Sequence, residues 1–417
     1  MTTKRHAALS FVFITVLLDM LAFGIIIPVL PKLIASFLHG DIGQSSKYLG
    51  LFITVWALMQ FFFAPVLGVL SDRYGRRPVI LLSNFGLGID YIIMALAPTI
   101  GWLFLGRLLS GITSSSGPTA NAYISDVTTP ETRSRAYGIF GAAFGLGFIL
   151  GPAAGGWLGH IDMRLPFWVA GGFSLLNAVY GFFILPESLP PERRAPKMLW
   201  KKANPVGALK LLRSHHELFG LASVSFLNYL AHEVYVTVFV LYATLRYSWN
   251  ERDVGYSLAV VGVTTMIVSA GMVGMLVKRF GERATLFLGL FLGALGFAFF
   301  GASPKGWIFL LAIPVNALWG LAAPPLQTMM TKRVSVTEQG ELQGAVGSLR
   351  GIAMIVGPGI FSTVFAFFLV PTRFLPGAPW FLSAIFLFAA LALARVVAPK
   401  ATTSVQEAPS VPVTTPV

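Results

Sequence analysis

Five ionisable side chains stand inside long apolar runs of this sequence. They are Asp19, Asp90, Arg107, Glu233 and Arg350. A charge at the centre of an apolar helix in a bilayer costs about 2.5 to 3.5 kcal/mol, so each needs a partner or a wet cavity. Burial favours the neutral form of a carboxyl group, which lets it take up and release protons. The chemistry predicted is proton exchange and binding of a charged group of a substrate, and we predict no catalytic residue.

Asp90 and Arg107 lie at nearly equal distances on either side of Pro98. A tight helical hairpin at this proline would bring both side chains to the same depth, where they can form an ion pair. Two interpretations are open. The pair either locks two helices together or senses protons or substrate.

Asp19 lies close to the middle of its apolar run. It is the first candidate for a proton-carrying group, and the alternative is an acid that only packs helices together. Glu233 is either a second proton carrier or a group that binds a cationic substrate. Arg350 either attracts an anionic substrate group or pairs with Glu233. His232 has no second histidine or acid at ligand spacing, so we predict no metal site.

The composition requires that the helices around these residues face lipid. Of 417 residues, 55% are apolar and 11% are charged, whereas soluble domains are about 25% charged. The absence of cysteine excludes disulfides and thiolate chemistry. We predict an all-α integral membrane protein with twelve transmembrane helices in two six-helix pseudo-symmetric bundles. The predicted spans are 8–31, 48–70, 79–97, 101–123, 137–158, 166–185, 218–243, 253–277, 284–301, 306–329, 341–369 and 378–397.

An internal repeat divides the chain. Residues 68–77, GVLSDRYGRR, recur as GMLVKRFGER at residues 274–283, and the same offset of 206 residues relates Pro118 to Pro324. Repeated units with a site at their interface are the architecture of secondary transporters. The predicted parts are an N-terminal bundle (1–185), a cytoplasmic linker (186–217), a C-terminal bundle (218–397) and a disordered tail (398–417).

The net charge of +13 follows from the loops. Roughly three times as many Lys and Arg fall in the loops of one side as in those of the other, which predicts a cell membrane protein, as in a bacterial inner membrane, with both termini cytoplasmic. Basic and aromatic residues do not interleave as a nucleic-acid surface would require, so no nucleic-acid partner is predicted.

Three motifs resemble those of one transporter family. Residues 68–77 resemble the signature loop of the major facilitator superfamily. Residues 106–111, GRLLSG, resemble its second motif, and residues 147–156, GFILGPAAGG, resemble the motif of its antiporters. Together with Asp19, Asp90 and the segment EQGELQG at 338–344, these motifs resemble the tetracycline-efflux branch of drug/proton antiporters, over about residues 8–397.

The resemblance implies roles for two further sets of residues. It implies a cytoplasmic gate, for which the alternative is a loop that only anchors the topology; its residues are Gly68, Asp72, Gly75, Arg76, Asp126 and Arg133. It also implies a helix that bends or packs closely at Gly147, Gly151, Pro152, Gly155 and Gly156. We expect the glycines to serve internal packing in preference to dimerisation. It further implies that Asp19, Asp90 and Arg107 face the translocation path.

The chain departs from this branch at three positions. Tetracycline exporters carry a His in helix 8 and an Asp in helix 9, where this chain has Thr265 and Gly293. The branch usually has Gln where this chain has Glu233. The proton site of that branch is therefore not expected to carry over unchanged, and an acid has moved to a new position.

The predicted function is export of small amphipathic compounds by drug/proton antiport. The alternative is an uptake symporter or facilitator for a nutrient or metabolite with the same fold. A membrane enzyme is disfavoured because the sequence has no HExxH, Walker or GxSxG motif. We predict no cofactor, since a proton gradient supplies the energy, and we expect the protein to work as a monomer in the lipid bilayer with substrate and protons as partners.

Overall fold

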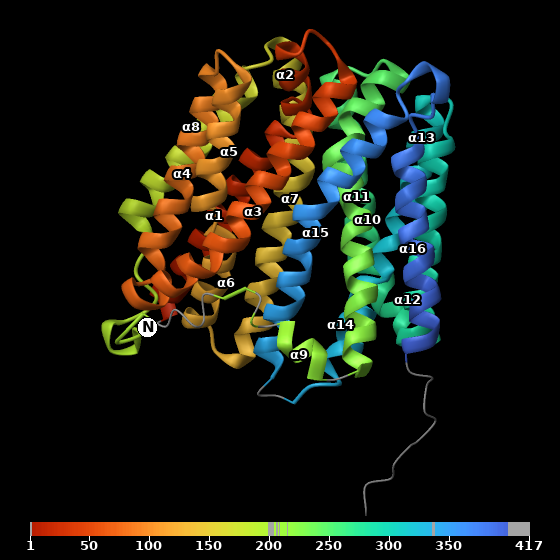
Figure 1. Ribbon diagram of the computed structural model, residues 1–417. Helices are drawn as coiled ribbons and strands as arrows, with labels where there is room; N and C mark the ends of the chain where they lie inside the picture. Colours follow the sequence, from red (N-terminus) through yellow and green to blue (C-terminus); the bar gives the residue numbers. More distant parts are fainter. Residues whose placement is uncertain are drawn as a thin grey trace, which may run out of the picture.

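The computed structural model describes residues 2–198, 204–205, 207, 209–214, 216–335 and 338–398. Within these residues the regular structure is helical and no strand occurs (Figure 1). The tail predicted at 398–417 lies outside these residues except for Ala398, and so does part of the predicted linker.

Helices in the first part of the chain are α1 (Thr2–Ile26), α2 (Leu30–Phe37), α3 (Ile42–Tyr74), α4 (Arg76–Leu96), α5 (Ile100–Thr113), α6 (Ser116–Val127), α7 (Pro130–Ile161) and α8 (Leu165–Ile184). After the short α9 (Leu209–Ser214), the second part contains α10 (His216–Tyr247), α11 (Glu251–Ile267), α12 (Val273–Ala302), α13 (Gly306–Ala317), α14 (Ala323–Thr331), α15 (Gln339–Phe367) and α16 (Ala378–Val397). We call these sets the α1–α8 group and the α10–α16 group.

The twelve predicted spans all have helical counterparts. Ten helical segments of the described chain are long and apolar enough to cross a membrane. One of them, Glu251–Ala302, contains two predicted spans that meet at Gly281, where φ is 80°. The predicted span 101–123 is the remaining one, and it is broken at Ser114 and Ser115 into α5 and α6. The prediction of an all-helical membrane protein is confirmed.

Irregular turns of helix interrupt two spans of the α10–α16 group. A π-helical turn, η3 (Val268–Met272), joins α11 to α12, and a 3₁₀ turn, η4 (Leu318–Leu321), joins α13 to α14. Val268 and Leu321 lie in one small apolar cluster that is separate from the main core. Hydrophobic periodicity did not predict either turn, because the residues of both are mainly apolar.

Glycine allows the sharp breaks between spans at two repeat-related positions. Gly75 ends α3 with φ 109°, and Gly281 breaks α12 with φ 80°. L-residues with a side chain rarely adopt this region, so glycine is needed at each break. The two positions are 206 residues apart, which is the offset of the sequence repeat.

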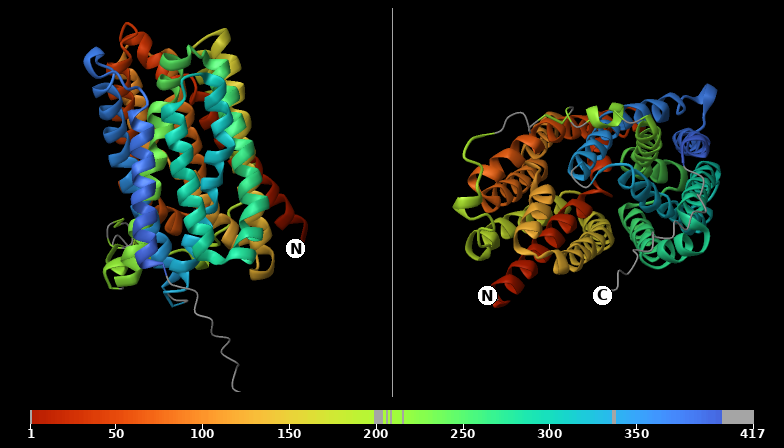
Figure 2. Two further views of the ribbon diagram at one scale, coloured as in Figure 1. Left: turned by 90° about the vertical axis from the view of Figure 1, so that its right-hand side faces the viewer. Right: turned by 90° about the horizontal axis from the view of Figure 1, so that it is seen from below.

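The bundle has two ends with different packing. The α2 end carries α2, and the linker end carries α9 and the start of α1 (Figures 1 and 2). The two groups contact each other where α3 packs on α15 and where α7 packs on α11. Near the α2 end, the Ser46 hydroxyl donates to the Ser362 carbonyl at 3.4 Å, and further along the Thr54 hydroxyl donates to the Ile355 carbonyl at 3.0 Å.

Within the described residues, the α1–α8 group contributes to the shared apolar core only at the α2 end. The main cluster combines Val29, Ile34 and Phe52 of the α1–α8 group with residues such as Val254 and Phe361 of the other group. At the linker end a second cluster contains only residues of the α1–α8 group; they are Val12, Val16, Ile80, Ala120, Tyr123, Ile124, Ala136, Ala143 and Leu185. The two groups are therefore joined at the α2 end.

Candidate functional site

Asp90 and Arg107 form a buried ion pair between α4 and α5. The Arg107 Nη2 group donates to Asp90 Oδ2, and the two residues are 0% and 7% exposed. A side chain at Gly106 would overlap the Asp90 carboxylate, so glycine allows the close approach. The structure forms the pair that their spacing around Pro98 predicted. Because both residues are buried and paired with each other, this geometry favours the interpretation in which the pair joins two helices.

Asp19 lies where three helices of the α1–α8 group meet. It is 4% exposed, and its Oδ1 accepts a hydrogen bond from Asn177 Nδ2 of α8 at 2.9 Å. The Ser116 hydroxyl of α6 also donates to this carboxylate. Sequence reasoning missed Asn177, whose signal was a single amide inside the apolar run 166–185. The carboxylate of Asp19 is thus held by two uncharged donors and has no cationic partner among the described ion pairs.

Glu233 and Arg350 face each other from α10 and α15. Glu233 is 6% exposed, and its side-chain stem packs against the backbone of Gly357. Arg350 is exposed and lies within electrostatic range of Glu233 and His232. The ion pairs found in the described part of the chain do not include Glu233 with Arg350. The two groups are close, but the direct pair that the sequence left open is not formed.

Arg76 is the centre of the predicted gate at the linker end. Its guanidinium contacts Asp72 at 2.5 Å and Asp126 at 3.1 Å. Arg133 instead donates to the Ser125 carbonyl at 3.3 Å, so the prediction that it is a charge partner in this cluster is wrong for this conformation. The cluster joins the ends of α3, α4 and α6 within the α1–α8 group.

Glu187, which the sequence analysis missed, caps the N-terminus of α4. Its carboxylate accepts hydrogen bonds from the backbone N–H groups of Arg76 at 2.8 Å and Arg77 at 3.3 Å. A negative charge is favourable at this end of a helix. The carboxylate of Asp72, another residue of the predicted gate, pairs with Arg76 instead. The signal for Glu187 was its position two residues after the span 166–185.

The two glycines of the signature loop have different roles. A side chain at Gly75 would overlap the Glu187 carboxylate, so this glycine makes room for the cap. A Cβ atom at Gly68 would meet nothing within 4 Å. Gly68 therefore serves no close approach in this structure.

The second unit repeats the gate contact with its charges reversed. Glu282 Oε1 and Lys332 Nζ lie 2.6 Å apart at the linker end of the α10–α16 group. These residues follow Arg76 and Asp126 by 206 residues each. The repeat has therefore preserved an ion pair between equivalent helix ends while exchanging its acid and base.

The glycine run of α7 packs against two helices. Added Cβ atoms at Gly147, Gly151 and Gly155 would collide with α1, the last of them with the Ile25 carbonyl. Gly156 faces the opposite side of α7, where an added Cβ atom would collide with the backbone of Glu251 and Gly255 in α11. α7 remains one continuous helix through Pro152. The run supports close internal packing, as expected, and it reaches both groups.

Lys32 and Glu251 link the two groups at the α2 end. The Lys32 Nζ group lies 3.0 Å from Glu251 Oε1 and also donates to the Trp249 carbonyl at 3.3 Å. Lys32 belongs to α2, and Glu251 begins α11. Both side chains are 14% exposed, so water screens the pair only in part. We call this contact the α2-end latch.

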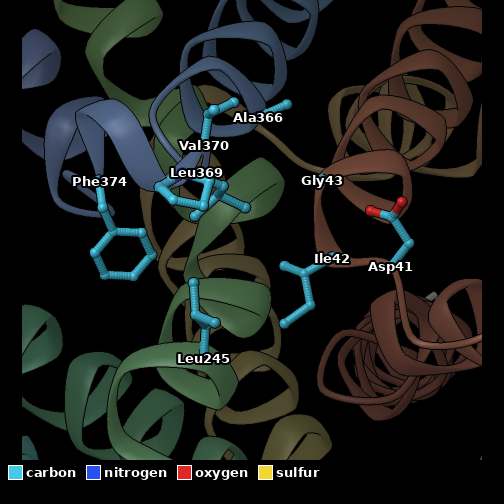
Figure 3. A pocket seen from close by; sticks show the side chains of 9 residues that line it. Asp41, Ile42, Gly43, Leu245, Ala366, Leu369, Val370 and Phe374 are labelled. Atoms are coloured by element: carbon cyan, nitrogen blue, oxygen red, sulfur yellow. The ribbon is translucent and has the colours of Figure 1, made fainter.

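A surface groove lies between the groups at the same end. Its volume is about 380 Å³, and its walls are the start of α3 and the end of α15, with Leu245 of α10 at its base (Figure 3). Asp41 is the acidic residue among its mainly apolar lining. The groove marks where the two groups meet and contains none of the five candidate path residues.

Removing the α2-end latch is expected to favour opening at this end. Lys32→Met should change the ratio of closed to open molecules by roughly fivefold, because a partly screened ion pair contributes up to about 1 kcal/mol. The chain has no cysteine, so spin labels can be placed at Gln44→Cys and Thr372→Cys, two exposed positions on opposite groups. Distances between the labels report the ratio.

The control for the latch is Lys305→Met, which removes an exposed lysine in a loop near α13. It should leave the label distances unchanged. An unchanged distance distribution in Lys32→Met would show that the latch does not hold the groups together.

Comparison with known proteins identifies the fold family. Residues 12–358 match the Major Facilitator Superfamily. The chain belongs to this superfamily. A nucleoside transporter of known structure superimposes on it with a TM-score of 0.79 at 13% sequence identity, over 94% of this chain and 100% of that one. Such a likeness supports the superfamily fold.

Curated relatives within the superfamily place the chain more closely. The class C tetracycline resistance protein of Escherichia coli is 38% identical over 87% of this chain and 91% of its own length. The class G tetracycline resistance protein of Vibrio anguillarum is 38% identical over 84% of this chain and 88% of its own length. The resemblance to the tetracycline branch of the superfamily, inferred from the motifs, is confirmed.

The structure gives a reason for one departure from that branch of the superfamily. The Trp319 ring fills the space in front of Gly293, where an added Cβ atom would lie 2.7 Å from its Cγ atom. An acid at position 293 would therefore displace the indole. In this chain the indole of Trp319 therefore occupies the space that an acid at position 293 would need.

Proposed function

We propose that this chain is a proton-coupled exporter of small amphipathic compounds, with tetracycline-like compounds among its substrates. The observation that carries the proposal is the 38% identity to a tetracycline resistance protein over 91% of that protein's length. A match this complete covers both repeated units and all three motifs. The substrate, protons and the lipid bilayer are the partners, and the chain works as a monomer without a cofactor.

Asp19 is the coupling acid in this proposal. Its carboxylate is buried at mid-span with Asn177 as a neutral donor, so its charge is costly and protonation relieves that cost. Glu233 and Arg350 carry charge on the substrate side, between the groups. Asp90 and Arg107 hold α4 and α5 in place around the path.

The transport cycle we propose rests on two moving units, residues 1–185 and 218–397, joined by a cytoplasmic linker at 186–217. The basic loops support placing the linker end in the cytoplasm of a cell membrane protein. The shared core at the α2 end then supports a conformation that is closed outside and open inside. Asp72, Arg76 and Asp126 form the gate at the inner side, next to Arg133.

Reconstitution into liposomes tests the proposed function. Purified protein is sealed with a pH-sensitive dye under an imposed pH gradient, and tetracycline and other amphipathic compounds are added one at a time. Antiport predicts that a transported compound drives protons in the opposite direction. Proton flux in the same direction as the compound would support the uptake alternative, and no compound-dependent flux across the panel would overturn the proposal.

A further inference from the structure

Two aromatic side chains form a rigid wall around His232. Trp319 Nε1 donates to Asn228 Oδ1 at 2.6 Å, and the Tyr235 hydroxyl donates to Asn316 Oδ1 at 2.5 Å. The His232 ring centroid lies 5.8 Å from that of Trp319 and 6.0 Å from that of Tyr235. The hydrogen bonds fix both flanking rings, so we call Trp319, His232 and Tyr235 the aromatic wall.

The aromatic wall is accessible at His232. Its neighbours in α10, Ala231 and Glu233, are 0% and 6% exposed, whereas His232 itself is exposed. The ring of His232 is flanked by Trp319 and lies within electrostatic range of Arg350 of α15. A planar ring can pack on such a surface with little loss of side-chain entropy, because the wall is already ordered.

Arg350 is the accessible charge beside this wall. It is exposed, and within the described part of the chain no hydrogen bond or ion pair engages its guanidinium. The next residue, Gly351, packs against Phe61 of α3, which places Arg350 where the two groups adjoin. An arginine keeps its charge in proteins, so an exposed guanidinium in a spanning helix that no protein anion engages is available to bind an anionic group.

Glu233 balances only part of the positive charge of Arg350. Its stem is fixed against Gly357, and its carboxylate acts on Arg350 from a distance without direct contact. A carboxyl group can become neutral by binding a proton, whereas the guanidinium cannot. The lasting, accessible charge at the wall is therefore positive.

We propose that Arg350 and the aromatic wall form a binding site for planar aromatic compounds that carry an acidic oxygen group. The ring packs on His232 and Trp319, and the acidic oxygens bind the guanidinium of Arg350. This inference rests on the proposed function and narrows its substrate class from amphipathic compounds in general to aromatic acids.

Glu233 competes with the ligand for the positive charge of Arg350. When Glu233 is ionised, it neutralises part of the positive charge that attracts the acid. Replacement by Gln removes this competition while the shape is kept. Glu233→Gln should therefore tighten the binding of an aromatic acid and leave a neutral ring compound unaffected.

Equilibrium dialysis with matched probes tests the site. The full chain in lipid nanodiscs is titrated with 2-naphthoate and with 2-naphthylmethanol, which share one ring system and differ in charge. The wild type should bind the acid more tightly than the alcohol. Arg350→Gln should weaken binding of the acid about tenfold or more, as expected for a charge-assisted contact, and leave the alcohol unchanged.

Further variants separate the ring contact from the charge contact. Trp319→Leu should weaken both probes, and Glu233→Gln should tighten the acid alone. Arg373→Gln is the matched control, since Arg373 is exposed and packs on Phe367 near the α2 end. Binding of the alcohol to Arg350→Gln also verifies that this variant is folded.

Two results would overturn the site. One is equal affinity of the wild type for the acid and the alcohol, and the other is acid binding that Arg350→Gln does not weaken selectively. If such a result came with proton-coupled flux in the liposome assay, the proposed function would stand without this site. Arg350-dependent acid binding without any coupled flux would uphold the site and overturn the proposed function.

Discussion

Asp90→Leu is expected to lower the free energy of unfolding by about 3 to 5 kcal/mol, because it leaves the Arg107 guanidinium buried without its partner. Arg107 is 7% exposed and cannot lose its charge. Arg107→Leu should cost less, since the remaining Asp90 carboxyl can bind a proton and become neutral. Residual monomer on size-exclusion chromatography after heating in detergent measures both losses.

The double replacement of this pair decides between its two interpretations. Asp90→Leu with Arg107→Leu removes both charges together, and apolar residues often replace a buried ion pair without loss of stability. The double variant should therefore be more stable than Asp90→Leu alone. If it transports as well as the wild type, the pair only joins α4 to α5; a stable variant without transport would assign the pair to sensing. Equal losses in the two single variants would contradict the proposed asymmetry.

Asp19→Asn is expected to abolish proton-driven accumulation while substrate exchange continues. Asparagine has nearly the shape of aspartate and can remain beside Asn177, but it cannot take up a proton at physiological pH. A transporter that has lost its coupling acid still moves substrate down its own gradient. Uphill flux under a pH gradient and exchange of substrate without a gradient, measured in the same liposomes, separate the two activities.

Glu192→Gln is the control for this measurement, because Glu192 is an exposed acid outside the spans. It should leave both activities unchanged. Uphill flux at the wild-type level in Asp19→Asn would remove Asp19 from the coupling mechanism and direct attention to Glu233.

The spans and the repeat were predictable because they depend on properties that are local in the sequence. A lipid-facing helix needs a continuous apolar run of sequence. The 206-residue offset can be read from the repeated residues themselves, and it relates Gly75 to Gly281, the two glycines at the breaks between spans. The depth of Asp90 and Arg107 was equally predictable, since residues count along a helix at a fixed rise. The helix face on which each residue lies was not predictable, because any of several helices can pack against that face.

Contacts between distant segments account for what the sequence did not reveal. Glu187 caps α4 although it lies more than a hundred residues further along the chain, and the sequence near position 76 does not indicate this contact. The break of the 101–123 span at Ser114 is equally dependent on context, because the Ser115 N–H group bonds the Ser83 hydroxyl of α4. The identity of the Asp19 partner, Asn177, also depends on how α1 meets α8.

The reversed polarity of the two repeated ion pairs has a consequence for inner closure. Had duplication kept Arg76 and its copy alike, two cations would confront each other each time the inner halves drew together. Instead Arg76 corresponds to Glu282 and Asp126 to Lys332, so repeat-related positions at the linker end carry opposite charges. Closure of the linker end would therefore bring unlike charges of the two units toward one another.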